Sequence, residues 1–396
     1  SLARSSQAPP LPTESRRTTC RGSPPTGHIH LAPLPSSMNT VHVNLGSRSY
    51  EILVAPGLLA ESGSRIQATG LTGMAAIITD DNVAPHFLEQ LESSLLKVGY
   101  TFSSHIFPAG EASKSMAVVE NLNRELIQAG HNRSSFVIAL GGGVTGDLAG
   151  FVASIFYRGI PFVQIPTTIV SQVDSAVGGK TGVNAPEGKN LIGAFHQPRL
   201  VLTDPNTLLT LPGREFREGF AEVIKHAAIR DEAMLTELEA PDPTDQNVPS
   251  ELISRNVAIK ARIVEEDEQE TSGTRALLNF GHTIGHGIEA SVPYGTLLHG
   301  EAISLGIRAA LRLSENHAGL APVESQRILA LLTQYQLPLK LSDEIPTDLV
   351  IEKLLRDKKF SGGEKTFILL DRPGNGITCS SIPFEEIALT IDFLRS

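Results

Sequence analysis

One short stretch of the chain concentrates side chains that can bind a metal ion. Residues 279–301, NFGHTIGHGIEASVPYGTLLHGE, contain three histidines and two glutamates, whereas the whole chain of 396 residues contains twelve histidines. Imidazole nitrogens and carboxylate oxygens are common protein ligands of zinc. His282 and His286 stand four residues apart, which places them on one face of a helix. The spacing alone therefore favours a zinc site made by both histidines with an acidic residue nearby.

A second segment has the spacing of a phosphate-binding loop. In SFVIALGGGVTGDLAGFVASIFYRG, Gly141, Gly143 and Gly146 form a GxGxxG pattern after an apolar run and before a helical one, the context in which this motif binds dinucleotides. Glycines let the backbone approach a pyrophosphate, and the amides of a helix N-terminus suit its charge. A tight strand-to-helix turn without a ligand has the same spacing, so both interpretations stay open at this point.

The elements that must position these groups alternate in the first half of the chain. After a hairpin-like opening (VHVNLG, SYEILVAPG), strand-like and helix-like runs follow one another as AAIITD, VAPHFLEQLESSLLKVG, FSSHIFPAG, MAVVENLNRELIQAG and SFVIALGGG. This alternation predicts right-handed crossovers and a parallel sheet. Asp80 and Asn82 follow AAIITD, so we expect them at the carboxyl edge of that sheet, where a nucleotide's sugar hydroxyls can be held.

Helical periods dominate beyond about Pro212, for example in REFREGFAEVIKHAAIRDEAM, ELISRNVAIKARIVEEDE and GEAISLGIRAALRLSENH. Only EKTFILLDRPGNGITCSS interrupts them, as an expected hairpin. The length of the chain also suggests two domains. We therefore predict an N-terminal α/β, Rossmann-like parallel-sheet domain over residues 38–211 and a mainly α-helical domain over residues 212–396, with ligands bound between them.

Composition limits the class of protein. The formal net charge of −10 argues against a nucleic-acid surface, which needs clustered Lys and Arg. No apolar run in the sequence approaches the roughly 18 to 20 residues of a membrane span. The two cysteines, Cys20 and Cys379, lie far apart and form no disulfide framework, which favours a reducing compartment, and we expect a cytoplasmic protein.

Residues 1–37 differ from the rest of the chain. They are rich in Ser, Pro and Arg, and Glu14 is their only acidic residue. We expect this segment to be disordered. A targeting peptide, such as a plastid transit peptide, has a similar composition. Because no amphipathic periodicity is visible, a simple extension before Met38 is the favoured interpretation.

Several long motifs together resemble one known family, the 3-dehydroquinate synthases among the sugar phosphate cyclases. The motifs are GGGVTGDLAGFVASIFYRG, PFVQIPTTIVSQVDSAVGGKTGVNAPEGKNLIGAFHQP, LPGREFREGFAEVIKHA, NFGHTIGHGIEA, LLHGEAISLGI and LLRDKK. They occur in the family's order, and the resemblance extends from Met38 to the C-terminus. It implies a dehydroquinate synthase-like fold and a homodimeric enzyme that uses NAD and zinc. The implied substrate is a phosphorylated keto acid, 3-deoxy-D-arabino-heptulosonate 7-phosphate, and the products are 3-dehydroquinate and phosphate.

The implied reaction explains why one site needs both NAD and zinc. A Lewis acid on a secondary hydroxyl promotes hydride transfer to NAD. The resulting ketone acidifies the neighbouring C–H, so phosphate leaves by elimination. Return of the hydride, ring opening and an intramolecular aldol step then close the carbocycle. The resemblance thus implies that NAD is catalytic and that the enzyme is a carbon–oxygen lyase of the shikimate pathway, which leads to chorismate and the aromatic amino acids.

The resemblance assigns the metal ligands differently from the spacing. It implies Glu222 from AEVIKH, His282, and His299 from LLHGE as zinc ligands, and leaves His286 to face the substrate. Three protein ligands leave an open position, as in catalytic rather than structural zinc sites. The sequence leaves open whether cobalt replaces zinc, and whether an amino-substituted analogue of the substrate is used.

Two further sets of residues follow from the resemblance. The substrate carries a carboxylate and a phosphate, and the residues implied for substrate binding and catalysis are Asp174, Lys180, Asn190, Lys225, Lys260, Arg275, Asn279, His286 and Lys358, with Arg158 reaching the neighbouring subunit's site. The residues implied for NAD binding are Asp80, Asn82, Glu111, Lys114, Gly142, Gly143, Val144, Asp147, Thr167, Thr168, Lys189, Thr210 and Glu215. Between Lys260 and Arg275 this chain is one residue longer than the family's usual form.

Three classes of function compete. The retained pair Asn279 and His286 favours the 3-dehydroquinate-forming lyase over other sugar phosphate cyclases. A metal-dependent polyol or glycerol dehydrogenase would share the two-domain plan, but it would consume NAD and leave the Lys and Arg residues without a purpose. A non-catalytic protein that binds NAD and metal is the third class. One assay distinguishes the three classes. Stoichiometric NADH release indicates a dehydrogenase, phosphate release with catalytic NAD indicates a cyclase, and the absence of both indicates a non-catalytic protein.

Overall fold

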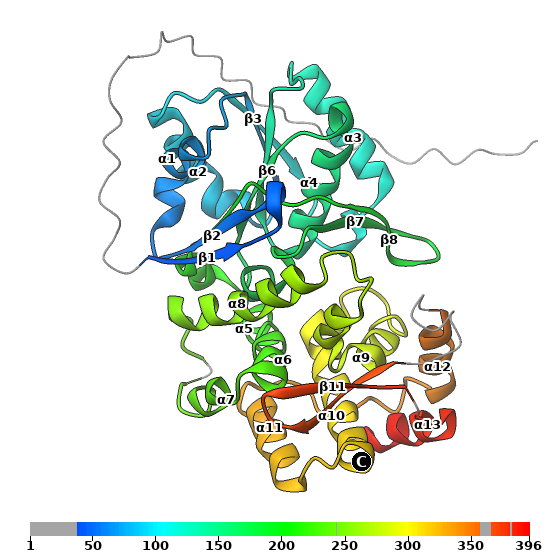
Figure 1. The fold of residues 1–396 in the computed structure, drawn as a ribbon. Coiled ribbons are helices and arrows are strands. Elements are labelled where there is room, and N and C mark those ends of the chain that lie inside the picture. The colour runs from blue at the N-terminus through cyan, green and yellow to red at the C-terminus, as the bar shows by residue number, and fades with distance from the viewer. Residues whose placement is uncertain (1–37, 243, 357–365, 381) are drawn as a thin grey trace, which may run out of the picture.

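The computed structural model describes residues 38–242, 244–356, 366–380 and 382–396 (Figure 1). The predictions for residues 1–37, including Cys20, and for Lys358 lie outside these ranges. An α/β part built on one sheet lies above a mainly helical part in this view. This arrangement confirms the predicted fold class. No helix in the described ranges is long and apolar enough to cross a membrane.

A seven-stranded sheet organises the α/β part. Its strand order is β1-β2-β9-β6-β5-β3-β4, and β1 pairs with β2 antiparallel, whereas the other pairs are parallel. The parallel sheet is thus confirmed, with the opening hairpin as its antiparallel edge. The strands are β1 (Asn39–Val43), β2 (Tyr50–Val54), β3 (Ala75–Asp80), β4 (Phe102–Phe107), β5 (Phe136–Gly141), β6 (Phe162–Pro166) and β9 (Leu200–Thr203).

Helices cover both faces of this sheet. One apolar cluster joins α1 (Leu58–Ala68) and α2 (Ala84–Lys97) to one face, and another joins α3 (Met116–Gln128) and α4 (Gly143–Ile155) to the other. The strands β3, β5, β6 and β9 are buried along their whole length. Parallel strands between two helical layers bury both faces, which explains their continuous apolar runs.

A separate hairpin, β7 (Lys180–Ala185) and β8 (Gly188–Phe195), follows the π-helical turn Ser171–Ser175. Lys180 and Thr181 of the GGKT motif begin β7, and the GKN motif begins β8. The two antiparallel strands of the hairpin lie close together, since a Cβ on Gly193 would lie 2.1 Å from the carbonyl oxygen of Thr181. In Figure 1 the hairpin extends from the α/β part on the side where α9 lies.

The second part of the chain is mainly helical, as predicted. A two-stranded hairpin, β10 (Phe367–Arg372) and β11 (Asn375–Cys379), interrupts the helices where the sequence indicated it. The helices are α5 (Gly213–Glu218), α6 (Phe220–Arg230), α7 (Glu232–Leu238), α8 (Ser250–Glu266), α9 (His282–Glu289), α10 (His299–His317), α11 (Pro322–Gln334), α12 (Thr347–Arg356) and α13 (Phe384–Phe393).

The two parts share one apolar core. A single cluster of buried side chains contains Ile52 of β2 and Val201 of β9 together with Ile224 of α6, Val257 of α8 and Ile307 of α10. The helix α8 runs beneath β1 and β2 at this junction (Figure 1). Burial of this shared apolar surface stabilises the contact between the parts, so residues on either side of the junction are held near one another.

Two glycines allow α9 and α10 to pack closely. Gly281, which precedes α9, has a φ of +77°, a left-handed conformation that glycine adopts without a steric penalty. A Cβ on Gly306 of α10 would lie 1.9 Å from the carbonyl oxygen of Gly281 and 2.8 Å from the amide nitrogen of Gly285. The backbones of the two helices therefore touch beside the histidine stretch.

We expect Gly306→Ala to separate these helices. Overpacking against backbone atoms costs about 1 to 3 kcal/mol, more than the roughly 1 kcal/mol that Gly→Ala gains inside a helix, so the free energy of unfolding should fall, as measured by urea denaturation. Gly213→Ala is the matched control, because its Cβ would meet only the end of the Arg217 side chain, at 3.0 Å. Equal stability of both variants would contradict the close-packing interpretation.

Candidate active site

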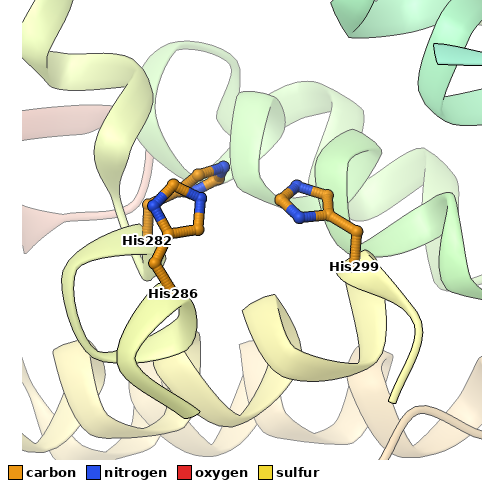
Figure 2. A group of neighbouring side chains, drawn as sticks. All are labelled: His282, His286 and His299. Atoms are coloured by element: carbon orange, nitrogen blue, oxygen red, sulfur yellow. The ribbon is translucent and has the colours of Figure 1, made fainter. Parts of the chain in front are cut away.

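The helices α9 and α10 bring the three histidines of the opening stretch together. His282 begins α9, His286 follows one turn later, and His299 begins α10. Figure 2 shows the rings of His282 and His286 on one side and the ring of His299 turned toward them. Each histidine offers a ring nitrogen within 4.8 Å of the others. A metal ion can therefore be reached by more than one set of donors here.

Glu222 of α6 joins this cluster from below the surface. Its side chain is completely buried, and its Oε1 lies 3.1 Å from His282 Nε2 and 3.2 Å from His299 Nε2. Its other oxygen, Oε2, pairs with Lys225 one helical turn later. One carboxylate oxygen and two imidazole nitrogens thus converge, which is the donor set of many catalytic zinc sites.

The Nδ1 atoms of His282 and His299 each have an oxygen neighbour as well. His282 Nδ1 lies 3.1 Å from the carbonyl oxygen of Phe280, and His299 Nδ1 lies 3.4 Å from Glu289 Oε2. Metal-binding histidines commonly use one ring nitrogen for such an oxygen and the other for the metal. The side chains of Glu222, His282 and His299 therefore fit zinc in both donor type and orientation.

A second group of possible metal ligands lies close by, formed by Asp174, Glu222 and His226. Asp174 comes from the π-helical turn after β6, and its Oδ1 lies 2.9 Å from Lys260 Nζ and 3.7 Å from Lys225 Nζ. Two ammonium groups thus face Asp174, whereas one, that of Lys225, is paired with Glu222 at the histidine site, so a cation would meet more repulsion here. This group is consequently a poorer metal site than the one at His282 and His299.

The cations around Asp174 set its charge. Burial raises the pKa of this carboxyl group, but Lys260 and Lys225 outweigh burial and hold the pKa well below its usual value. Burial also lowers the pKa of Lys260 to about 8, although Asp174 opposes the shift. Lys260 also donates to the Asp174 carbonyl oxygen at 2.8 Å. An ionised carboxylate thus stands next to an amine that can exchange a proton near neutral pH.

The other cations predicted to bind substrate lie on neighbouring segments. Arg275 is buried and donates to the carbonyl oxygens of Gly178, at 3.1 Å, and Glu268, at 2.5 Å. Lys180, at the start of β7, is half exposed and pairs with Glu270 at 2.5 Å. Glu270 Oε1 also lies 3.9 Å from Arg275 Nε, so one carboxylate currently faces both cations.

Asn279, Asn190 and Arg158 lie on three different segments. Asn279 ends the 3-10 turn Thr274–Asn279, two residues before Gly281. Asn190 lies on β8 with a φ of +56°, and its amide donates to Asn184 Oδ1 at 2.9 Å. Arg158 follows the C-terminus of α4, a helix about 20 Å long, so the structure does not bring it to the end of α4 where the glycine loop lies.

The predicted NAD residues gather at the carboxyl ends of the parallel strands. β5 ends at Gly141, Gly142 precedes α4, and Gly143 and Val144 begin it, so the expected strand–loop–helix context of the glycine motif is confirmed. Thr167, beside Thr168 after β6, donates its amide to the Gly141 carbonyl at 3.0 Å. Asp147 in the first turns of α4 pairs with Lys114 at 2.5 Å.

Asp80 stands at the end of β3 as predicted, but its carboxylate is engaged within the protein. It accepts from the Asn82 amide at 3.1 Å and from Thr145 Oγ1 at 2.9 Å. These bonds tie the β3 loop to α4, and a role at a nucleotide sugar stays a prediction. Thr210 ends the 3-10 turn Pro205–Thr210 that follows β9, and Glu215 lies on α5.

The PAGEASK loop and the β7–β8 hairpin are linked. Glu111 accepts from Asn184 Nδ2 at 2.8 Å, and Lys189 Nζ lies 3.9 Å from Glu111 and 2.8 Å from Glu289. Glu289, Glu270 and His226 were missed by sequence reasoning. A signal existed for Glu289, because it follows His282 by seven residues and so shares its helix face.

The chain matches known proteins over most of its length. The 3-dehydroquinate synthase N-terminal family matches residues 104–218, and the 3-dehydroquinate synthase C-terminal family matches residues 219–360. A 3-dehydroquinate synthase of Pelobacter propionicus is 47% identical over 84% of this chain and 93% of its own length. One of Rhizobium johnstonii is 43% identical over 91% of this chain and 97% of its own length.

Solved structures also match the fold. The 2-epi-5-epi-valiolone synthase ValA of Streptomyces hygroscopicus, with NAD+ and Zn2+ bound, is 30% identical with a TM-score of 0.80, over 87% of this chain and 96% of that one. A 2-deoxy-scyllo-inosose synthase, 24% identical with a TM-score of 0.81 over 89% and 99% of the two chains, shows the fold alone. Because the family matches span more than half of the sequence and the curated relatives exceed 40% identity, the chain belongs to the 3-dehydroquinate synthase family.

Proposed function

We propose that the chain converts 3-deoxy-D-arabino-heptulosonate 7-phosphate to 3-dehydroquinate and phosphate. The observation that carries this proposal is the convergence of Glu222, His282 and His299 beside two buried lysines, Lys225 and Lys260. A metal site flanked by buried cations suits a substrate that carries hydroxyl groups together with a carboxylate and a phosphate. The names of the curated relatives support the same reaction.

We further propose NAD and zinc as cofactors. ValA, at 30% identity, was solved with both bound, and the glycine loop and the three convergent donors of this chain fit them. NAD supplies reversible hydride transfer, and zinc supplies a Lewis acid for a substrate hydroxyl. Glu222, His282 and His299 would hold the metal, and the loop at Gly142 and Gly143 would hold the pyrophosphate.

The chain's own residues then handle charge and protons. Arg275 and Lys180 bind substrate anions, which would displace the Glu270 carboxylate that faces both now. Lys260 can move a proton near neutral pH because burial lowers its pKa to about 8. His286, one turn after His282, faces the same space and serves the substrate. Holding the two ends of one molecule together favours the final intramolecular aldol step.

A homodimer would complete the site. Arg158 and the preceding Tyr157 have φ angles of +68° and +49°, a conformation that costs non-glycine residues about 1 to 3 kcal/mol and recurs at functional positions. Ile155 and Tyr157 are exposed apolar side chains beside it. We propose that this end of α4 contacts a second copy of the chain and delivers Arg158 to its site. The cytoplasmic location stays a prediction.

A polyol dehydrogenase is the alternative. The glycerol dehydrogenase of Schizosaccharomyces pombe shares the fold with a TM-score of 0.58, at 20% identity, which supports the fold alone. Incubation of the purified chain with the heptulosonate phosphate, NAD and zinc should give 3-dehydroquinate and one phosphate per turnover at constant NAD. Accumulation of NADH with glycerol, and no phosphate release, would support the dehydrogenase instead.

Alanine variants of His299 and His286 distinguish a metal ligand from a catalytic residue. His299→Ala leaves two protein donors, so bound zinc should fall below one per subunit together with activity. His286→Ala should keep nearly stoichiometric zinc yet lose about 100- to 10,000-fold in kcat, because that is the usual contribution of a proton-transfer group. Metal analysis and kinetics of both variants check this. Zinc lost from His286→Ala but retained in His299→Ala would restore the HxxxH site suggested by spacing.

Lys180 tests substrate binding. Charge-assisted contacts contribute about 2 to 4 kcal/mol when water is excluded, but Lys180 is half exposed, so solvent screening lowers its effect. We expect Lys180→Ala to reduce kcat/KM by about 10- to 100-fold in a steady-state phosphate-release assay. Lys97→Ala, on the exposed last turn of α2, is the control. Unchanged kcat/KM in Lys180→Ala would remove this residue from the site.

A further inference from the structure

Glu289 contacts both the histidine cluster and Lys189 on the β7–β8 hairpin. It is the last residue of α9, and its side chain is only 11% exposed. Its Oε2 lies 3.4 Å from His299 Nδ1, and its Oε1 lies 2.8 Å from Lys189 Nζ on β8. Each oxygen therefore faces a different part of the chain, one in the helical part and one in the α/β part.

The contact continues beyond Lys189. Lys189 Nζ lies 3.9 Å from Glu111 and stands 5.1 Å from the ring centre of Tyr294. Glu111 in turn accepts from Asn184 at 2.8 Å, and Asn184 accepts the Asn190 amide at 2.9 Å. A continuous series of polar contacts thus runs from a proposed zinc ligand to the hairpin that carries the GKN motif.

We propose that Glu289 is a positioning residue that makes the binding of zinc and the binding of NAD mutually dependent. This inference rests on the proposed function, because it takes His299 as a metal ligand and Lys189 as a cofactor residue. It adds a residue that neither the spacing nor the resemblance assigned, and a property, coupling between two ligands, that follows from its two contacts.

The physical reason lies in how a bound cation acts on His299. His299 would hold zinc through Nε2 and would then keep its Nδ1–H for Glu289, a donor that a bound cation would strengthen. A more firmly held Glu289 carboxylate restrains Lys189 and with it the β7–β8 hairpin. Ordering that hairpin in advance lowers the entropy cost of binding NAD. By linkage, bound NAD must then tighten zinc by the same factor.

The test measures each ligand with and without the other, on the full chain. Calorimetry gives the NAD dissociation constant of chelator-treated and zinc-loaded protein, and competition with a chelator gives the zinc dissociation constant with and without NAD. We expect each ligand to bind wild-type protein about fivefold or more tightly in the presence of the other. In Glu289→Gln the two ratios should fall to about one, and zinc should bind about 10- to 100-fold more weakly.

Lys189→Gln tests whether the coupling between zinc and NAD requires the second contact of Glu289. It leaves the His299–Glu289 contact in place, so zinc affinity without NAD should match wild type, while the coupling ratio falls to about one. The double variant should show no further loss of coupling, since both changes interrupt one pathway. Glu385→Gln, on an exposed part of α13, is the matched control and should keep both affinities and the ratio.

Unchanged coupling in Glu289→Gln, or equal affinities with and without the second ligand in wild type, would overturn the inference. Loss of zinc affinity in Glu289→Gln with intact coupling would also overturn it, because Glu289 would then support the metal alone. The product assay decides the proposed function separately. A wild-type chain that couples zinc and NAD but forms no 3-dehydroquinate would uphold the inference and reject the reaction.

Discussion

The fully buried carboxylate of Glu222 constrains the whole site. Burying an ion costs several kcal/mol unless partners compensate for lost water. Burial raises the pKa of Glu222, yet Lys225 and His282 outweigh burial and hold the pKa well below its usual value. Lys225 comes from the same helix, but His282 and His299 come from α9 and α10. Three helices must therefore meet at one carboxylate, and the close α9–α10 contact at Gly306 allows it.

A second carboxylate, that of Asp174, links the two parts of the chain. Asp174 belongs to the α/β part, whereas Lys225, His226 and Lys260 reach it from α6 and α8. A single acid thus faces several side chains across the junction, and removing it would leave the buried charge of Lys260 without this partner. The shared apolar core holds the parts in contact, and this polar group fixes where they meet.

Local pattern was sufficient for most of the fold but not for the β7–β8 hairpin. The buried strands read as continuous apolar runs and the helices as periodic ones, so the parallel sheet and helical part were predictable. The segment KTGVNAPEGKNLIGAF has glycines, charges and a largely exposed second strand, and packing against α4 defines it. Within the site, helix periodicity places His282, His286 and Glu289 on one face, but their distance to His299 depends on the α9–α10 contact, which no local pattern specifies.

The electrostatic field inside the site depends on its buried side chains rather than on the net charge of the chain. The chain carries a net charge of −10, yet the substrate proposed for it is an anion. Lys225, Lys260 and Arg275 are all less than 8% exposed, so their fields act at short range in a medium of low effective dielectric. Surface acids act through water and salt, which screen charges beyond about 8 Å. The buried cations Lys225, Lys260 and Arg275 therefore act on the interior of the site more strongly than the acidic exterior does.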